Sequence, residues 1–462
     1  MTSLRFRDDG TFRVLQMADI QDKPEVDADT IRLIREAIAQ ADPDLVVFTG
    51  DQIRGYDPAY IDTFLRRRGE EPGARVRLIT EIEARLHGIK RRERARELMD
   101  ETRVKVRRTF AGFLGPIIEA GVPFAATYGN HDFQCGILTD EQDDIYREFP
   151  GCLNPPSFTG PLALESGTFA LPIASSTNPN RIAMSVMMVN SGDYADTNTP
   201  DERDGQYPAY VVNSRGLDLA DSDGYGTPSA EAIQWLKDVQ KELGWRNGDG
   251  KPVPAIAFQH IPPQEFYDLL QEVPAWTPNA VEGARTHAGH TYVLNQELCR
   301  PGSRLGEAIG CADENIGEVE ALSEAGGYFA LFCGHDHKNA FVGHAHGIDL
   351  GYAPTCGFEC YGPKSRYRGI RLFEFHESNP AGYVTRMLTW GDLVGRYSSN
   401  EVRVWFEDHC ITDAIGMRNE LRRPQVFAVL AGAMSIGFLT AIHAVVKANR
   451  PQRAGSTTQN RH

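Results

Sequence analysis

Short apolar segments that end in metal-binding residue types constrain the fold of this chain more than any other feature. Such segments lie at Phe12–Ala18, Leu45–Thr49, Pro123–Thr127, Ala255–Phe258 and Tyr328–Cys333. Continuous apolar runs of this length are typical of strands buried on both faces of a parallel sheet. A helical pattern with Ile31, Ile34 and Ile38 on one face separates the first two runs. The order strand, helix, strand predicts an α/β fold.

The residues that follow these runs carry the donor atoms of a metal site. In chain order they are Asp19, Gln21, Asp51, Asn130, His131, Asp132, His260, His335 and His337. Ligands of open α/β sheets bind beyond the carboxyl ends of the strands, so we expect these side chains to meet at one edge. A single histidine after a strand is more often a hydrogen-bonded loop residue. Five such strand ends in this order predict a metal centre.

Asp51 is the residue that we expect to bridge two metal ions, because a carboxylate has two oxygens. The mixture of Asp and His ligands suits Mn, Fe or Zn, whereas Mg and Ca prefer more oxygen. Two ions about 3.5–4 Å apart lower the pKa of a shared water and hold both the attacking and the leaving oxygen of a phosphoryl group. The expected cofactors are therefore two divalent ions, and the expected chemistry is hydrolysis of a phosphate ester.

The motifs themselves resemble the calcineurin-like metallophosphoesterase superfamily. They are D-x-Q at Asp19, GD at Gly50, GNHD at Gly129, the single His260 and GHDH at Gly334. The stretches at 190–195, 258–269 and 333–343 look like the purple-acid-phosphatase-related branch of that superfamily. The resemblance covers about residues 12–390. It implies a four-layer αββα sandwich of two mixed sheets, with a dinuclear metal centre between them.

The same resemblance implies a role for each residue of the centre. Metal one would be held by Asp19, Asp51 and His337. Metal two would be held by Asp51, Asn130, His260 and His335. His131 would lie near the leaving oxygen as a general acid or transition-state stabiliser, oriented by Asp132. Asn130 and His131 would also contact the substrate.

Two positions depart from the pattern of the superfamily. Gln21 stands where a histidine is usual, and an amide oxygen is a weaker ligand than imidazole, which leaves open whether Gln21 ligates metal one. Arg54 stands where purple acid phosphatases have their coloured tyrosine, and Tyr56 lies two residues further on. We therefore expect no Fe(III)–tyrosinate centre. Arg54 either faces the substrate phosphate or is a surface arginine.

Length and charge limit the remaining function classes. The 462 residues fit a catalytic domain over 1–405 with appendages. A net charge of −15 argues against a general nucleic-acid binder. The segment 60–120 is predicted to be a charged helical insertion. It is either a cationic lid or a solvated helical face with paired charges, and we favour the second interpretation. Eight cysteines without a CxxC pair predict reduced thiols in a cytoplasmic protein.

The C-terminal region predicts a membrane anchor. Residues 426–446 contain no Asp, Glu, Lys or Arg. A helix of this length spans about 30 Å, the thickness of the hydrocarbon core of a bilayer. We expect a membrane-anchoring helix over 425–447 and a disordered tail over 448–462; an apolar helix docked on the domain is the alternative. Since the N-terminus carries no recognisable signal peptide, we expect the domain on the cytoplasmic face of the membrane.

The leading hypothesis is a dinuclear metal-dependent phosphoesterase that hydrolyses a phosphate ester by attack of a metal-bound hydroxide. One alternative is a phosphodiesterase or pyrophosphatase with a lipid-linked substrate, which the anchor favours. The other is a membrane-tethered protein that binds metal or phosphate without turnover, which Gln21 permits. The pair His131–Asp132 weighs against this last alternative. The expected partners are a phosphorylated small molecule or lipid and the membrane, and no nucleic acid is expected.

Overall fold

Two mixed β-sheets form the centre of the molecule. The computed structural model describes residues 4–57, 59–60, 63–64, 74–194, 210–213, 216–219, 224–395, 402, 405–406, 410 and 414–448. The first sheet has the order β17 (Val384–Thr389), β16 (Gly369–His376), β1 (Thr11–Met17), β2 (Leu45–Thr49), β3 (Phe124–Thr127). The second has the order β14 (Val342–Ala345), β15 (Ile348–Tyr352), β13 (Tyr328–Cys333), β9 (Ala255–Phe258), β6 (Ile182–Met188), β5 (Thr168–Ala174), β4 (Ala163–Glu165).

Four of the five strands that were predicted from apolar runs are internal in these sheets, and the fifth, β3, is an edge strand. β2 is buried along its whole length and pairs in parallel with β1 and β3. β9 is likewise buried and lies in parallel between β6 and β13. A strand that is covered on both faces needs apolar side chains at every position, which explains why these runs do not alternate with polar residues. The carboxyl ends of β1, β2, β3, β9 and β13 therefore lie toward the same region.

The helices and smaller strands surround this centre. The helices are α1 (Ala28–Ala41), α3 (Ala74–Leu86), α4 (Arg91–Glu119), α5 (Asn130–Phe133), α6 (Thr139–Arg147), α7 (Ala230–Arg246), α8 (Glu318–Ala325), α9 (Trp390–Leu393), α11 (Ala414–Leu421) and α12 (Pro424–Ala448). Short 3-10 helices lie at Gln264–Leu269, Arg285–His287, Ser365–Tyr367 and Pro380–Gly382. A small antiparallel sheet has the strand order β10 (Leu270–Glu272), β12 (Thr291–Leu294), β11 (Val281–Glu282). A second one consists of β7 (Tyr210–Asn213) and β8 (Gly216–Leu219).

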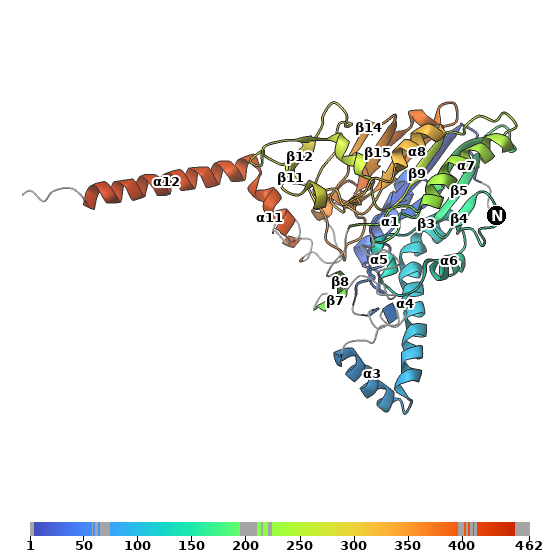
Figure 1. The fold of residues 1–462 in the computed structure, drawn as a ribbon, viewed down its shortest axis with the longest axis horizontal. Helices are drawn as coiled ribbons and strands as arrows, with labels where there is room; N and C mark the ends of the chain where they lie inside the picture. Colours follow the sequence, from blue (N-terminus) through green and yellow to red (C-terminus); the bar gives the residue numbers. More distant parts are fainter. Residues whose placement is uncertain are drawn as a thin grey trace, which may run out of the picture.

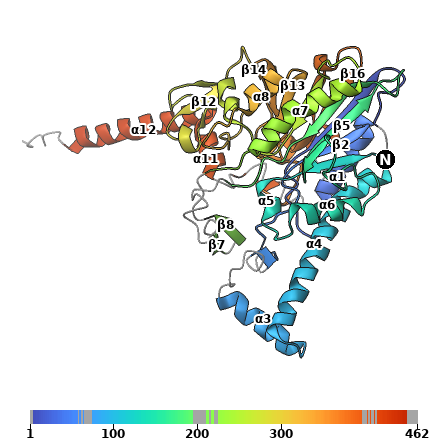
Figure 2. The same cartoon turned by 45° about the vertical axis from the view of Figure 1, so that its right-hand side comes forward.

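Three hydrophobic cores hold four layers together. One core lies between the sheets and includes Val47 of β2 and Phe332 of β13. A second joins the first sheet to α1 and α4, and the third joins the second sheet to α7 and α8. Figure 1 and Figure 2 show the two groups of helices on opposite outer faces. The predicted αββα sandwich is confirmed.

The segment expected to be a helical insertion divides into two structurally different parts. The C-terminal half of α4 buries Val106, Phe110 and Ile117 against the first sheet, so it is the crossover helix between β2 and β3. The N-terminal half of α4 and α3 project away from the sandwich (Figure 2). Arg94 in this projecting part forms ion pairs with Glu83, Glu97 and Glu101. Such contacts fit the interpretation as a solvated face with paired charges.

The C-terminal helix α12 extends away from the sandwich (Figure 1). By length and composition alone, Pro424–Ile442 could cross a membrane, and no residue of its most apolar part is buried. The preceding helix α11 is held to the small β10–β12–β11 sheet, since Arg418 pairs with Glu282 and Arg422 donates to the Ala280 carbonyl. The alternative of an apolar helix packed on the domain does not occur. The expected tail over 448–462 lies outside the described residues except for Ala448.

All eight cysteines are free thiols. Six are buried and two, Cys152 and Cys410, are partly exposed. Burial raises the pKa of Cys135 and Cys152 to about 12, so neither is a thiolate at neutral pH. Cys135 and Cys152 therefore serve as small apolar residues of the core beside the first sheet.

Candidate metal centre

The strand ends bring the predicted ligands together through an uncommon backbone conformation. Asp19, Gln21, Asp51 and His335 all have positive φ, between 41° and 75°. Residues other than glycine rarely adopt this left-handed region, and when they do they cluster at functional sites where the surrounding fold imposes it. Hydrogen bonds that cross between strand ends fix it here: Asp19 N–H donates to the Gly50 carbonyl, and Gln21 N–H to the Asp51 carbonyl.

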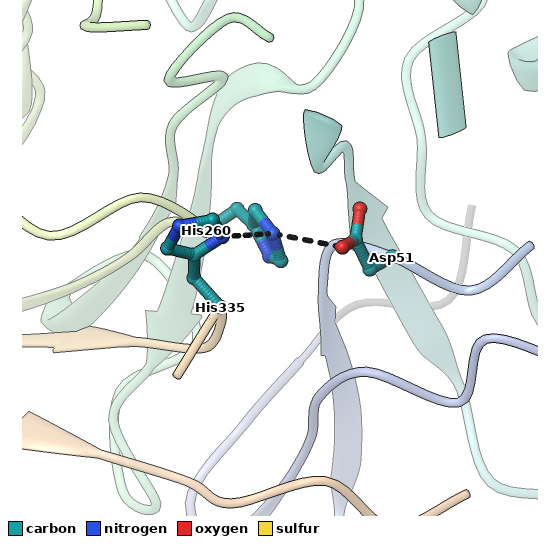
Figure 3. Close-up of side chains that lie close together, drawn as sticks. All are labelled: Asp51, His260 and His335. Carbon is teal, nitrogen blue, oxygen red and sulfur yellow. Dashed lines mark hydrogen bonds and ion pairs between the residues drawn. The ribbon is translucent and has the colours of Figure 1, made fainter. Parts of the chain in front are cut away.

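His260 lies at the centre of the first half of the site (Figure 3). Its Nδ1 is 2.9 Å from the Thr49 carbonyl oxygen, which can only accept, so Nδ1 carries the proton of the neutral ring. Its Nε2 then presents a lone pair to Asp51 Oδ2 at 3.2 Å, Asn130 Oδ1 at 3.1 Å and His335 Nδ1 at 3.2 Å. Asp51, His260 and His335 all offer ligand atoms within 4.8 Å of one another. Several electron-pair donors that converge in this way need a cation or a proton between them.

The second half of the site repeats this arrangement around His337. The Nδ1 atom is 2.6 Å from the Tyr361 carbonyl oxygen and is therefore the donor, which leaves the Nε2 lone pair 3.3 Å from Asp19 Oδ1. Within the described part of the chain, Asp19 Oδ1 has no hydrogen-bond donor although it is buried. Gln21 differs from the other donors, because its Nε2 donates to Asp51 Oδ2 at 2.9 Å and lies 3.2 Å from His337 Nε2.

The pKa values of the first half reflect the crowding of charge. Burial raises the pKa of Asp51, but the neighbouring rings of His260 and His131 outweigh it and hold that pKa below its usual range. Burial lowers the pKa of His260, yet Asp51 beside it raises the net value to about 9. Burial and His260 together keep the pKa of His335 well below its usual value. In the absence of a metal ion, a proton on His260 would balance Asp51.

Glycines before the ligands leave the space that this packing needs. Gly50 has φ +93°, and a Cβ atom there would lie 2.5 Å from the His260 ring. A Cβ atom at Gly129 would lie 2.3 Å from Asp51 Oδ1. Gly50 therefore permits a sharp backbone turn, whereas glycine is required at Gly129 by the close approach of Asp51 and not by its φ.

His131 lies at the rim of the centre, with 24% of its side chain exposed. Its backbone N–H donates to Asp51 Oδ1 at 2.8 Å, and its Nδ1 is 2.7 Å from Gln134 Oε1. The residue that orients the ring is thus Gln134. Residues three apart in a helical turn lie on one face, so the spacing from His131 in α5 to Gln134 at its C-terminal cap was the signal that could have identified it.

Asp132 does not contact the His131 ring, and the expectation that it orients this ring is corrected. Its carboxylate accepts hydrogen bonds from the backbone N–H groups of Gly129, Asp51 and Ile53. The reason is local, because an acidic residue at the third position of a helix turns back to the N–H group that precedes the helix. Asp132 therefore ties the loop after β2 to the loop after β3 and supports Asp51.

Arg54 is connected to the predicted ligands through Tyr56. It donates to the Glu359 carbonyl, its Nη1 is 3.8 Å from the Glu359 carboxylate, and its guanidinium lies over the Tyr56 ring. Tyr56 in turn packs edge-on against His131, and its hydroxyl donates to Gln21 Oε1 at 3.5 Å. Tyr56, and not Arg54, is the side chain of this loop that reaches the site.

Three further tyrosines were not predicted. Tyr194 accepts a hydrogen bond from Asn130, Tyr225 packs edge-on against His335, and Tyr361 stacks on His337. Tyr194 belongs to the NSGDYA stretch that carried the resemblance, so its motif was a signal. No sequence pattern indicates Tyr225 or Tyr361, which come from loops far from the histidines that they contact.

The donor atoms form two groups of different composition. Asp51, Asn130, His260 and His335 offer two oxygens and two ring nitrogens in one place, which suits Mn, Fe or Zn. Asp19 and His337 offer an oxygen and a nitrogen in the other place, and the Gln21 amide N–H occupies part of the space beside them. Hydrogen bonds from Nδ1 to backbone carbonyls orient His260 and His337, as is usual for histidines that bind a metal ion.

Comparisons with known proteins agree with this geometry. The family model described as calcineurin-like phosphoesterase matches residues 12–339. Probable inactive purple acid phosphatase 28 of Arabidopsis thaliana is 24% identical over 406 residues, 80% of this chain and 77% of that protein. Probable inactive purple acid phosphatase 29 of the same organism is 23% identical over 428 residues, 86% of either chain. These relatives support the predicted branch of the superfamily.

Two solved structures were also found. A dimetal phosphatase from Danio rerio matches with a TM-score of 0.39 and 12% identity, over 82% of this chain and 99% of that chain. A protein of Thermus thermophilus matches with a TM-score of 0.34 and 10% identity, over 82% of this chain and 99% of that chain.

Proposed function

The chain belongs to the calcineurin-like phosphoesterase family and is a metal-dependent phosphoric ester hydrolase, and from this premise we propose that it cleaves its substrate at a pair of divalent metal ions. The observation that carries the proposal is the orientation of two histidines. His260 and His337 both donate through Nδ1 to a backbone carbonyl and direct the Nε2 lone pair toward a carboxylate. Each histidine with its carboxylate then forms half of the centre.

The residues divide into two ligand sets that share Asp51. Asp51, Asn130, His260 and His335 would hold metal two, and Asp19, Asp51 and His337 would hold metal one. When bound, such ions lower the pKa of a water molecule and neutralise charge on the phosphoryl oxygens. The protein keeps the ligands in place through Asp132, whose bonds to three backbone N–H groups fix the loop of Asp51.

His131 is the residue that we assign to the leaving oxygen. Because Nδ1 donates to Gln134 Oε1, the ring can release a proton toward substrate only from Nε2. Proton donation by His131 therefore requires the imidazolium form, and Gln134 keeps the ring in one orientation while the proton moves.

The test is hydrolysis of p-nitrophenyl phosphate beside bis(p-nitrophenyl) phosphate by the full-length protein in detergent. The protein is stripped of metal and then supplied with Mn²⁺, Zn²⁺ or Fe²⁺. We expect turnover that depends on added metal, and the ratio of the two rates assigns the enzyme to monoesters or diesters. A folded protein that binds metal and hydrolyses neither compound would contradict the proposal.

The second candidate is a protein that binds metal or phosphate without turnover. It is favoured by Gln21, whose amide N–H stands where the superfamily usually has an imidazole ligand, and the relatives found bear the words "probable inactive" in their names. Calorimetry with inorganic phosphate and Mn²⁺ distinguishes the candidates. Binding of phosphate without hydrolysis of any ester would favour the second one.

We further propose that α12 tethers the catalytic domain to the cytoplasmic face of a membrane. The exposed apolar surface of the helix supports this, since Met434, Phe438 and Leu439 are each more than 60% exposed. Carbonate extraction of membranes should leave the full-length protein in the pellet and release a chain that ends before Pro424. Release of both chains would contradict the tether. A lipid-linked phosphate ester remains the alternative substrate, which the same assay tests in mixed micelles.

A further inference from the structure

Four tyrosines contact the predicted metal ligands and their neighbour His131, each at a different residue. Tyr361 stacks on His337 with ring centroids 4.1 Å apart, and Tyr225 packs edge-on against His335 at 4.2 Å. Tyr56 packs edge-on against His131 at 4.7 Å. Tyr194 accepts a hydrogen bond from Asn130 at 2.9 Å and stacks on Tyr225. We call Tyr56, Tyr194, Tyr225 and Tyr361 the tyrosine collar.

The collar residues are more exposed than the ligands that they contact. The predicted ligands are all buried, and the most exposed of them, His335, has only 8% of its surface accessible. Tyr361 is 46% exposed, and the other three collar residues are partly exposed. A molecule bound at the ligands would therefore have exposed tyrosine rings beside it.

The cationic groups near the collar are engaged with protein partners. Glu359 forms ion pairs with both Arg54 and Lys23. The guanidinium of Arg54 also lies over the Tyr56 ring, and the ammonium of Lys338 lies over the Tyr361 ring at 5.6 Å. Arg54 and Lys338 thus form cation–π contacts with the electron-rich faces of two collar rings. The collar thus offers aromatic edges and faces to a ligand, whereas a site for several phosphates would offer free cations.

We propose that the collar selects phosphate esters whose alcohol part carries a flat aromatic ring next to the phosphate. This inference rests on the proposed function, because it places the phosphate at the metal ligands and the ring against the tyrosines. Aromatic pairs prefer offset-stacked or edge-to-face contacts, and a saturated ring of equal size cannot make them. Tyr361 carries most of the selection, since it is the most exposed member of the collar.

The experiment compares benzyl phosphate with cyclohexylmethyl phosphate, using full-length protein loaded with Mn²⁺. The two esters have rings of similar size and primary alcohols as leaving groups, so they differ mainly in aromaticity. We expect kcat/KM to favour benzyl phosphate about five-fold, with the difference in KM. Tyr361→Leu should abolish this preference and Tyr361→Phe should retain it.

A matched control is Tyr367→Leu. Tyr367 is 40% exposed, similar to Tyr361, but it packs on Arg304 and Arg366 away from the ligands. This variant should keep the wild-type preference. Weaker metal binding in Tyr361→Leu would lower the rates with both esters equally, so the ratio of the two esters separates contact with the ring from support of His337.

The outcomes separate this inference from the proposed function. Equal kcat/KM for both esters, or an unchanged preference in Tyr361→Leu, would overturn the inference and leave the phosphoesterase function standing. If neither ester is hydrolysed, the rates with p-nitrophenyl phosphate and bis(p-nitrophenyl) phosphate decide the proposed function, and calorimetry with benzylphosphonate and cyclohexylmethylphosphonate decides the inference. Tighter binding of benzylphosphonate would support the collar as an aromatic binding site, and equal affinities would refute it.

Discussion

The two halves of the candidate metal centre are built on the same plan but differ in one side chain. In each half a histidine donates through Nδ1 to a backbone carbonyl and directs Nε2 at a carboxylate, His260 at Asp51 and His337 at Asp19. The half around His260 adds Asn130 and His335, which direct Oδ1 and Nδ1 at His260 Nε2. The half around His337 adds Gln21, which directs an N–H donor at Asp51 Oδ2.

This difference has a consequence for metal affinity. In the His260 half, several atoms with lone pairs point at one place, and a cation can bind there. In the His337 half, the Gln21 amide N–H already donates to Asp51 and so balances part of its negative charge. A metal ion in the His337 half must displace the hydrogen bond between Gln21 and Asp51 before it can use both carboxylates. We therefore expect metal two to bind more tightly than metal one.

Asp51→Asn should have the largest effect, because both halves share this carboxylate. We expect kcat to fall by about 10² or more and bound metal to decrease in both halves, while the fold persists because Asn can still accept from the His131 N–H. Hydrolysis rates and metal content per protein are the measurements. Asp313→Asn, which removes a carboxylate from the peripheral pair with Arg285, is the control and should change neither. Equal loss in both variants would refute the bridging role.

His131→Ala should reduce kcat by about 10²-fold without loss of metal, since the ring is placed at the leaving oxygen and not among the ligands. Gln134→Ala should reduce kcat less, by about five-fold, because it frees the orientation of the ring but leaves its chemistry. Gln134→Glu keeps an acceptor for Nδ1 and should restore most of the activity. A loss of metal in His131→Ala would place this histidine among the ligands instead.

Gln21→His addresses the difference between the halves directly. An imidazole at this position removes the N–H donor that opposes metal one and supplies a stronger ligand. We expect the affinity for the second equivalent of Mn²⁺ to rise about ten-fold and that for the first to stay constant. Equilibrium dialysis measures both. Weaker binding of the second equivalent would mean that the glutamine side chain does not stand at the ligand position.

Glu318→Gln should leave catalysis unchanged and alter only the pH dependence of stability. Burial raises the pKa of Glu318 to about 8, so the folded protein holds a proton that the unfolded chain releases above about pH 4.5. Stability contributed by this group therefore falls as pH rises from about 4.5 to 8. The Tm of the wild type should drop more steeply over this range than that of Glu318→Gln. Parallel curves would contradict the assigned protonation.

Much of the fold could be predicted because the buried strands carry an unambiguous pattern. β2, β9 and β13 begin and end where the apolar runs do, since a strand covered on both faces consists mostly of apolar residues. The segment 60–120 was harder to interpret. Charged residues dominate its composition and conceal the buried stripe of Val106, Phe110 and Ile117, which makes half of α4 part of the core.

The candidate site could be predicted in its residues but not in its internal contacts. Asp19, Asp51 and His335 are each the second residue after their strand, and the topology of an α/β sheet brings such positions together. Their left-handed backbone is imposed by hydrogen bonds between strand ends and has no signal in the local sequence. The same holds for Tyr361, which reaches His337 from a different loop. Contacts of this kind depend on three-dimensional packing.

The most direct test of the unequal halves is a titration of metal-free, full-length protein with Mn²⁺, in which bound metal and hydrolysis of p-nitrophenyl phosphate are followed together. The account predicts a first equivalent that binds at least about ten-fold more tightly than the second, and turnover that rises with the second equivalent. Turnover that is complete after one equivalent, or two equivalents that bind with the same affinity, would contradict it.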